Sequence, residues 1–417
     1  MPEAKYILVG SSHAALEALR SIRLHDPEGS MAMITRDAHL PYSPTVLPYV
    51  VSGRSKPEKV LLRDEDFFTA NACTFVPNAV AAGLDAKTKT LKLANGDSWR
   101  YETLLIATGA APAIPPVKGL DSVNYHVLRT LDDAKRLRSA MGGARSAVVL
   151  GAGLVGLHAA ENLAEAGLSV SVVEMQDHVL PGYFDPKASE TIESAFTSHG
   201  VKLFLKSKVV AVEARDGGHS CTVTLENGNT ISADLLLVAT GVRPVTDWLD
   251  GSGVKLDRGV LVDETMRTNV EGIWAAGDVA QALDFHTGKQ ALIGIIPTAV
   301  DQGRIAGMGM AGDSYVRAYP GGVPVNTYRF FGRVALSIGQ AAATTAGYEI
   351  AVSEEGGYRR LVLSDNRLVG YASVDQPFDV GVMGELIRRK VDLTECKDAF
   401  MARPVETGRR LMSEQWR

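Results

Sequence analysis

The sequence contains few cysteines, and their spacing excludes chemistry that needs paired thiols. Its 417 residues include three, Cys73, Cys221 and Cys396. They form no CxxC or CxxxxC pair, the spacing expected of a redox-active dithiol. We therefore expect all three to be structural. Unpaired cysteines also fit a reducing compartment, so a cytoplasmic location is expected.

Several other features are absent. No apolar run approaches the roughly 18 residues of a membrane span, and residues near Tyr6 enter a strand without a signal-peptide pattern. A formal net charge of −5 gives no reason to expect nucleic acid or an anionic membrane as partner. The nine histidines show no i, i+3 or i, i+4 pairing and no Cys/His ligand spacing, so no metal site is predicted.

The strongest motif spans residues 147–174. An apolar stretch at 147–150 leads into Gly151-Ala-Gly153-Leu-Val-Gly156, then a helical run, a second strand at 169–173 and Glu174. In a dinucleotide-binding turn the first glycine makes the turn, the second lets backbone N–H groups approach a pyrophosphate, and the third lets the helix pack closely. The acid at the tip of the second strand accepts hydrogen bonds from a ribose. The predicted NAD-binding residues are Gly151, Gly153, Leu154, Val155, Gly156, Glu174 and Gly241.

Glu174 also indicates which nucleotide binds. A 2′-phosphate would lie against this carboxylate, and like-charge contact is unfavourable. Met175, Gln176 and Asp177 follow, so no arginine neutralises such a phosphate. We expect NADH rather than NADPH.

A degraded copy of the motif opens the chain. Residues 6–9 are mainly apolar and lead into Gly10-Ser-Ser12-His-Ala-Ala15, where Ser12 and Ala15 replace glycines. Each copy is followed by a strand and Ala-Thr-Gly, at residues 107–109 and 239–241. This internal repeat predicts two nucleotide-binding folds. The second fold lies between about residues 111 and 242, and the strand ending in Gly277-Asp278 and a helix at Pro297 come after it. The second fold is therefore predicted to be inserted into the first.

As an ordered set, these motifs resemble the pyridine nucleotide–disulfide oxidoreductase family of two-dinucleotide-binding-domain flavoproteins. The resemblance implies an α/β fold with an FAD domain (1–110 and 243–315), an inserted NAD domain (111–242) and a C-terminal α+β interface domain (316–417). It implies FAD at the first site, with Asp278 on the ribityl chain, Arg129 near the flavin or its pyrophosphate, and the Pro297 helix directed at the flavin. The FAD-binding residues so implied are Gly10, Ser12, His13, Ala14, Ala15, Pro44, Val80, Thr108, Gly109, Arg129, Gly277, Asp278, Pro297 and Thr298.

The FAD ribose acid is less clear from the sequence. After the apolar strand at 31–34 come Thr35, Arg36 and Asp37. The carboxylate expected there is missing or displaced by two residues.

Two candidate catalytic residues mark departures from the family. Thr45 stands where some members carry a redox cysteine, and a hydroxyl forms neither a disulfide nor a thiolate. His158 stands where many relatives have a glutamate paired with a lysine, and no lysine occurs between Arg36 and Arg54. Because histidine titrates near neutrality, His158 could carry a proton or charge near the nicotinamide. Packing on a helix is the alternative.

The C-terminal part predicts strands within 328–338 and 358–371, with a hairpin turn at Asp365-Asn366, and helices near 380–390 and 394–403. It resembles the interface domain of the family, as in the reductase module of NADH-dependent nitrite reductase, and could support homo- or hetero-oligomers.

The function expected from this resemblance is FAD-dependent NADH:acceptor oxidoreduction, with hydride exchanged between NAD(H) and FAD and single electrons exchanged with an iron–sulfur protein or subunit. The chain resembles the NADH:acceptor reductase subunits of aldehyde and phenylglyoxylate oxidoreductase complexes. The alternatives are a free-standing NADH oxidase or rubredoxin/ferredoxin reductase, and a flavoprotein that serves as a redox-dependent binding module.

Overall fold

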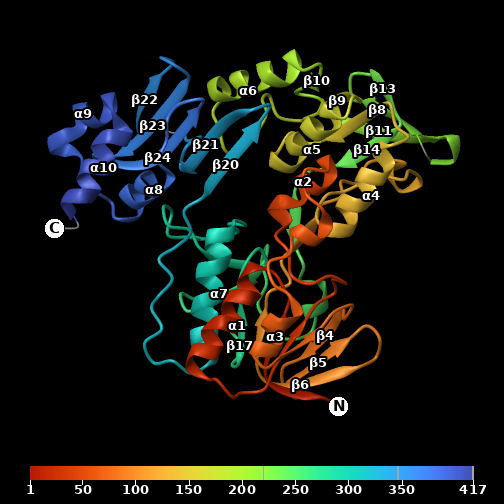
Figure 1. The fold of residues 1–417 in the computed structure, drawn as a ribbon, viewed down its shortest axis with the longest axis vertical. Coiled ribbons are helices and arrows are strands. Elements are labelled where there is room, and N and C mark those ends of the chain that lie inside the picture. The colour runs from red at the N-terminus through yellow and green to blue at the C-terminus, as the bar shows by residue number, and fades with distance from the viewer. Residues whose placement is uncertain (219, 345–346, 416–417) are drawn as a thin grey trace. The chain divides into compact units, whose positions relative to one another are not determined.

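The computed structural model describes residues 1–218, 220–344 and 347–415 (Figure 1). They form two compact units. The first comprises residues 1–46, 56–111 and 242–322, and the second comprises 47–55, 112–241 and 323–417. The segments predicted as NAD and interface domains thus group in one unit, and the three-domain division stays a prediction.

The first unit is built on a mainly parallel sheet in the order β3-β2-β1-β6-β5-β4, with β17 also pairing with β6. Its parallel part consists of β1 (Glu3–Val9), β2 (Met31–Ile34), β3 (Cys73–Val76), β6 (Ser98–Ile106) and β17 (Ile273–Ala275). β2 is buried along its whole length, as expected for a strand covered on both faces. β4 (Ala81–Asp85) and β5 (Thr90–Leu93) extend the sheet antiparallel.

Two helices lie side by side in this unit, α1 (His13–His25) and α7 (Ile296–Met310) (Figure 1). Their approach depends on small residues. A Cβ at Gly303 would lie 2.2 Å from the carbonyl oxygen of Ala14, and one at Gly307 would lie 2.5 Å from that of Ala18. Any larger residue at either glycine would push the helices apart.

The second unit repeats the same topology. Its parallel sheet has the order β10-β9-β8-β14, formed by Lys202–Phe204, Ser169–Val173, Ser146–Leu150 and Leu235–Val238. The helix α5 (Leu154–Glu165) joins β8 to β9 as α1 joins β1 to β2. The predicted pair of Rossmann-like folds is confirmed.

The C-terminal part of the second unit is an antiparallel sheet in the order β20 (Val325–Phe330), β21 (Arg333–Gly339), β24 (Arg367–Val374), β23 (Tyr358–Ser364) and β22 (Glu349–Ser353). The turn predicted at Asp365-Asn366 is confirmed: both residues have positive φ, 49° and 55°, as a two-residue hairpin turn requires. The sheet is held to the NAD-binding part by Asp185, the N-cap of α6 (Pro186–Ser198). Its carboxylate accepts hydrogen bonds from the Tyr358 hydroxyl at 2.8 and 2.7 Å and pairs with Arg360 at 2.8 Å.

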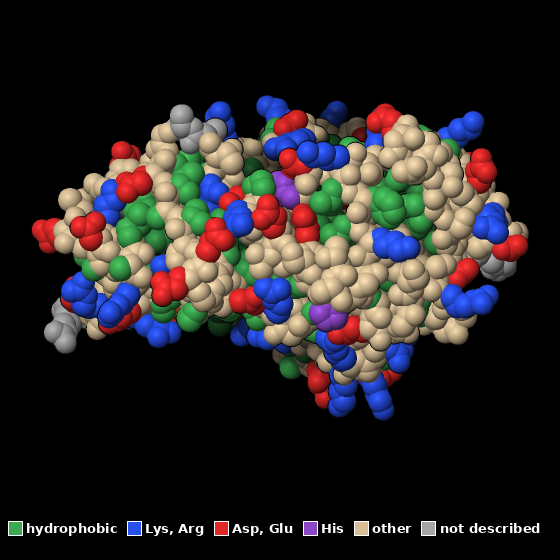
Figure 2. All heavy atoms as spheres, turned by 90° about the horizontal axis from the view of Figure 1, so that it is seen from above, with side chains coloured by type: hydrophobic (Ala, Val, Ile, Leu, Met, Phe, Trp, Pro, Cys, Tyr) green, Lys and Arg blue, Asp and Glu red, His purple; other side chains and the backbone are tan. Residues whose placement is uncertain are grey.

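The remaining elements complete these layers. The other helices are α2 (Leu47–Ser52), α3 (Glu65–Ala70), α4 (Leu131–Met141), α8 (Val380–Arg388), α9 (Lys397–Ala402) and α10 (Pro404–Gln415). The other strands are β7 (Ala110–Pro112), β11 (Val209–Arg215), β12 (Ser220–Leu225), β13 (Thr230–Ala233), β15 (Val242–Pro244), β16 (Val260–Leu261), β18 (Ala280–Leu283) and β19 (Gln290–Ala291). Every helix in the described part of the chain is too short or too polar to cross a bilayer. Acidic and basic side chains are interspersed on the face shown in Figure 2.

Candidate functional site

The first glycine turn lies at the carboxyl end of β1. Gly10 has φ +124°, and a Cβ there would lie 2.1 Å from the carbonyl oxygen of Ala107. Ser12 is the N-cap of α1, and its side chain makes no capping hydrogen bond. The turn is therefore shaped as its sequence predicts, and a hydroxyl stands at the middle position.

A second loop of the first unit is held by a side chain that the sequence did not single out. Gly277, with φ +80°, donates its N–H to the side-chain oxygen of Gln302 at 2.9 Å. Gln302 is 3% exposed and lies on α7, so this helix positions the loop carrying Asp278. Gly294 packs against the Asp278 carboxyl group, because a Cβ at Gly294 would lie 3.3 Å from its Cγ. A glutamine five residues after Pro297, in the helix predicted to face the flavin, is the signal that could have revealed this residue.

The position of the missing ribose acid is occupied by a hydroxyl pair. Thr35, at the tip of β2, accepts a hydrogen bond from the Ser11 hydroxyl at 3.2 Å. Asp37, the displaced candidate, has its carboxylate engaged by the Tyr42 hydroxyl at 2.5 Å and the His39 N–H at 3.0 Å. Thr35 and Ser11 match Glu174 and Ala152 of the second fingerprint in position, so the repeat itself could have identified them.

Thr45 lies in a short 3-10 turn, Pro44–Val46, and belongs to a hydrogen-bonded group. The Ser43 hydroxyl lies 2.9 Å from the Thr45 hydroxyl and 3.2 Å from Nε2 of His13. Burial lowers the pKa of His13; Asp278 opposes that shift and Arg63 reinforces it. The structure thus joins Thr45 to His13 through Ser43, and Asp278 acts electrostatically on His13. The sequence assigned Thr45, His13 and Asp278 to the flavin site.

The other predicted FAD residues are distributed as follows. Pro297 is the second residue of α7, one position later than predicted, and Thr298 beside it is buried. The Thr108 hydroxyl donates to the carbonyl of Val245 at 2.8 Å, and Val80 is 47% exposed. Arg129 belongs to the second unit, just before α4, so its assignment to FAD stays a prediction.

The second glycine turn has a separate structural reason for each of its glycines. Gly151 has φ +100°, and a Cβ there would lie 2.5 Å from the carbonyl oxygen of Ala239. A Cβ at Gly156 would lie 2.0 Å from the carbonyl oxygen of Gly151. A Cβ at Gly153 would meet nothing within 4 Å, so packing within the fold does not require a glycine there. Only Gly153 can therefore be explained by a ligand rather than by the fold.

Glu174 lies at the tip of β9, as predicted. Its carboxylate accepts hydrogen bonds from the N–H groups of Ala152, at 2.8 Å, and Gln176, at 2.9 Å. Met175 beside it is 64% exposed. The acid therefore ties the glycine turn to the end of β9. That its carboxylate also receives ribose hydroxyls stays a prediction. Leu154 and Val155 begin α5, with Val155 44% exposed, and Gly241 has φ +111°.

His158 requires a correction. It lies on α5, with its ring 4.7 Å from that of Tyr328 on β20 in an edge-to-face contact. Burial lowers the pKa of His158 from 6.5 to about 4, so the expectation that it titrates near neutrality is wrong. The imidazole is neutral at neutral pH, which agrees with the packing alternative; its catalytic role stays a prediction.

Two of the three cysteines, Cys73 and Cys221, are placed where burial makes a thiol unreactive. Cys73 and Cys221 are buried and Cys396 is half-buried. Burial raises the pKa of Cys73 to about 12 and that of Cys221 to about 11. Over the residues that the structure describes, no three His, Cys, Asp or Glu side chains gather as a metal site. His219 lies outside the described residues.

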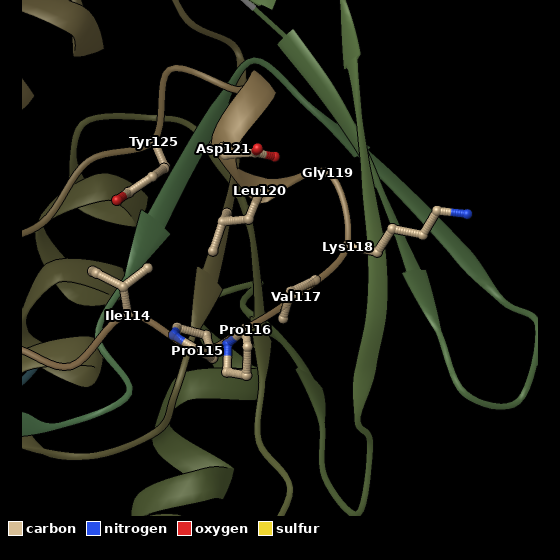
Figure 3. A pocket seen from close by; sticks show the side chains of 9 residues that line it. All are labelled: Ile114, Pro115, Pro116, Val117, Lys118, Gly119, Leu120, Asp121 and Tyr125. Carbon is tan, nitrogen blue, oxygen red and sulfur yellow. The ribbon is translucent and has the colours of Figure 1, made fainter.

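A pocket of roughly 500 Å³ lies in the second unit, at the loop that precedes α4 (Figure 3). Its wall is mainly apolar, and the side chain of Lys118 extends away from that of Tyr125. None of its lining residues belongs to either glycine turn. They are Ile114, Pro115, Pro116, Val117, Lys118, Gly119, Leu120, Asp121 and Tyr125.

The two glycine turns, each at the carboxyl end of a parallel sheet with the same strand order, define a protein with two dinucleotide-binding folds. The model of the pyridine nucleotide-disulphide oxidoreductase family matches residues 4–303, and the chain belongs to this family.

Known proteins resemble the chain over most of its length. It is 52% identical over 416 residues to the NADH-dependent phenylglyoxylate dehydrogenase subunit epsilon of Aromatoleum evansii. The aligned residues cover 99% of this chain and 98% of the relative. It is 28% identical over 410 residues to an NADH oxidase of Methanocaldococcus jannaschii, and this alignment covers 93% of this chain and 89% of the relative. The solved ferredoxin reductase from Rhodopseudomonas palustris superposes with a TM-score of 0.80 at 26% identity, covering 89% and 91%.

The chain is accordingly an NADH-dependent FAD oxidoreductase. The residues present fit both cofactors. At the second site Glu174 provides a carboxylate, which suits the ribose hydroxyls predicted for NAD(H). At the first site, hydroxyls of Ser11, Ser12 and Thr35 surround the glycine turn.

Proposed function

We propose that this chain is the NAD(H)-reactive subunit of a multi-subunit oxidoreductase that acts on an aldehyde or a 2-oxo acid. In this role it exchanges hydride between NAD(H) and FAD and exchanges single electrons with an iron–sulfur partner. The observation that carries the proposal is the 52% identity to a dehydrogenase subunit across nearly the full length of both chains. A cytoplasmic location is part of the same proposal.

The side chains around the first glycine turn support a route without sulfur. Bound FAD would accept a hydride as an electron pair and release electrons singly, which is chemistry of the cofactor itself. Thr45 supplies a hydroxyl at the position of the redox cysteine, and Ser43 fixes it by a hydrogen bond of 2.9 Å. Cys73 and Cys221 are buried, with pKa values raised to about 12 and about 11, so neither offers a thiolate at neutral pH.

The residues of the chain have distinct tasks in this scheme. We assign cofactor positioning to Gly10, Gln302 and Asp278 at the FAD site, and to Gly153 and Glu174 at the NAD(H) site. The neutral, half-buried His158 supports the second unit by packing on Tyr328. Oligomerisation through the antiparallel C-terminal sheet and its helices belongs to the same proposal.

The test combines partner capture with anaerobic kinetics. The tagged chain, isolated from its source cells, is expected to carry iron–sulfur subunits with it. The isolated flavoprotein is expected to be reduced by NADH rapidly and to pass electrons to one-electron dyes much faster than to oxygen. A chain that captures no iron–sulfur protein and reduces oxygen vigorously is instead a free-standing oxidase. Reduction by NADH over seconds to minutes, with a long-lived charge-transfer band, would indicate a binding module.

A further inference from the structure

Three side chains of the first unit form one continuous chain of hydrogen bonds. The hydroxyl of Ser43 lies 2.9 Å from Oγ1 of Thr45 and 3.2 Å from Nε2 of His13. Thr45 is exposed, Ser43 is 7% exposed and His13 is half-buried. These hydrogen bonds thus connect the accessible hydroxyl of Thr45, through the buried hydroxyl of Ser43, to the titratable imidazole of His13.

These three hydrogen-bonded side chains lie at the predicted FAD site. His13 is the first residue of α1 and directly follows the turn at Gly10, where β1 ends. Open parallel sheets bind their ligands outside the carboxyl ends of the strands. Asp278, which follows β17, acts electrostatically on His13. A Cβ at Gly277 would also lie 3.2 Å from Cβ of Ala14, so the loop of Asp278 lies next to the start of α1.

The proposed function leaves one proton unaccounted for, and the inference rests on that function. NADH delivers a hydride, which is two electrons and one proton. An iron–sulfur centre accepts electrons one at a time and no proton. Each NADH oxidised therefore yields NAD⁺, two exported electrons and one proton that has to leave the FAD site; in the reverse direction one proton has to enter.

We propose that Thr45, Ser43 and His13 are the path of this proton. Oγ1 of Thr45 accepts it while the proton of Thr45 passes to Oγ of Ser43, and the proton of Ser43 passes to Nε2 of His13. Each hydroxyl gains and loses one proton, and the imidazole is protonated once and then releases a proton to solvent. No electron moves along this path, because both leave through the partner centre.

The charges around His13 suit an acceptor that releases its proton again. Burial disfavours the imidazolium, and the Arg63 guanidinium adds to that effect. The Asp278 carboxylate opposes both. At neutral pH the imidazole is therefore mainly neutral and able to accept a proton. The buried Ser43 hydroxyl, with one proton and two lone pairs, can donate to His13 and accept from Thr45 at once.

The experiment separates proton transfer from a purely structural role of these contacts. FAD-loaded Thr45→Val, Ser43→Ala and His13→Gln proteins are compared with Thr45→Ser and Ser43→Thr, which keep the hydroxyls. Thr69→Val, on an exposed turn of α3, is the matched control in the same unit. Anaerobic reduction by NADH and reoxidation by ferricyanide are followed in H₂O and D₂O, and proton release is recorded with a pH-indicator dye. FAD content and circular dichroism check the fold.

The first three variants are expected to slow reoxidation relative to reduction by about 100-fold, since positioned proton acceptors commonly contribute roughly that much or more. Proton release should lag by the same factor, and His13→Gln should remove the pH dependence of reoxidation. The hydroxyl-retaining variants should restore wild-type behaviour. Equal slowing of both half-reactions, or reoxidation as fast as in Thr69→Val, would overturn the path. A wild-type chain that binds no FAD, or is not reduced by NADH, would refute the proposed function instead.

Discussion

Glu174 accepts a hydrogen bond from the backbone N–H of Ala152 at 2.8 Å, so the acid at the end of β9 holds the glycine turn at the end of β8. The same carboxylate is the predicted acceptor for the ribose hydroxyls of NAD(H). In the first fold the matching residues, Thr35 and Ser11, are joined through their hydroxyls at 3.2 Å. The two glycine turns thus have a similar backbone arrangement. At the predicted ribose position the second fold has a charged residue, Glu174, and the first has a neutral one, Thr35.

The Glu174 carboxylate is predicted to set the nucleotide preference of the second site. Glu174→Ala is expected to raise KM for NADH about ten-fold or more, because hydrogen bonds to a charged acceptor are lost. Glu174→Ala with Met175→Arg should shift the kcat/KM ratio towards NADPH, since the carboxylate that repels a 2′-phosphate is replaced by a nearby cation. Initial rates with both nucleotides measure the effect. An unchanged preference would show that Glu174 does not contact the ribose.

The glycines of the second turn should separate stability from binding. Gly156→Ala is expected to lower the free energy of unfolding by about 1 to 3 kcal/mol, because its Cβ would meet the Gly151 carbonyl. Gly153→Ala should change stability by less than about 0.5 kcal/mol, yet weaken NADH binding about ten-fold by crowding the pyrophosphate. Urea unfolding and NADH titration give the two quantities. Equal NADH affinity in Gly153→Ala would contradict a pyrophosphate at this residue.

His158 should couple stability to pH. Its pKa is lowered from 6.5 to about 4 in the folded chain, so folding favours the neutral imidazole. That contribution is fully present above pH 6.5 and is lost as the pH falls towards 4, by up to about 3 kcal/mol. In His158→Phe, which keeps an aromatic ring against Tyr328, the fall over this window should be smaller by that amount. Unfolding free energies of both proteins at several pH values decide the question, and identical slopes would contradict the burial of this histidine.

The ion pair between Asp185 and Arg360 should hold the C-terminal sheet on the NAD-binding fold. Both side chains are less than 10% exposed, at 9% and 7%. Asp185→Asn is expected to cost about 3 to 5 kcal/mol, since it leaves the Arg360 charge buried and unpaired. Asp185→Asn with Arg360→Met should recover much of this loss, and a double-mutant cycle of urea unfolding measures the coupling. Additive effects would mean that the pair contributes no coupling.

Thiol chemistry should be dispensable. Burial raises the pKa of Cys73 to about 12 and that of Cys221 to about 11, so native alkylation at neutral pH should spare both. Electron transfer from NADH to a dye should survive treatment with iodoacetamide, with peptide mapping to identify the labelled sites. Loss of this activity in a protein that remains folded would point to a thiol in the electron path.

Local signals in the chain were enough to predict the two folds. The spacing of Gly10, Gly151 and the two Ala-Thr-Gly segments is detectable in sequence because each contact involves the backbone: Ala107 meets Gly10 as Ala239 meets Gly151. Because only glycine permits so close a backbone contact, a glycine at these positions in the sequence indicates the turn. The hairpin turn at Asp365-Asn366 was predictable for the same reason, since few residues adopt positive φ easily.

By itself the sequence determined the two dinucleotide turns, the acid at Glu174 and the absence of a cysteine pair, because each depends only on residue type and on spacing along the chain. Only the tertiary structure decided that His158 is neutral, that Gln302 supports the loop of Asp278, and that His13, Ser43 and Thr45 share hydrogen bonds. The reason is physical. Desolvation depends on the packing around a residue, and the hydrogen bonds of Gln302 with Gly277 and of His13 with Ser43 join residues 25 and 30 positions apart, which spacing along the sequence does not specify.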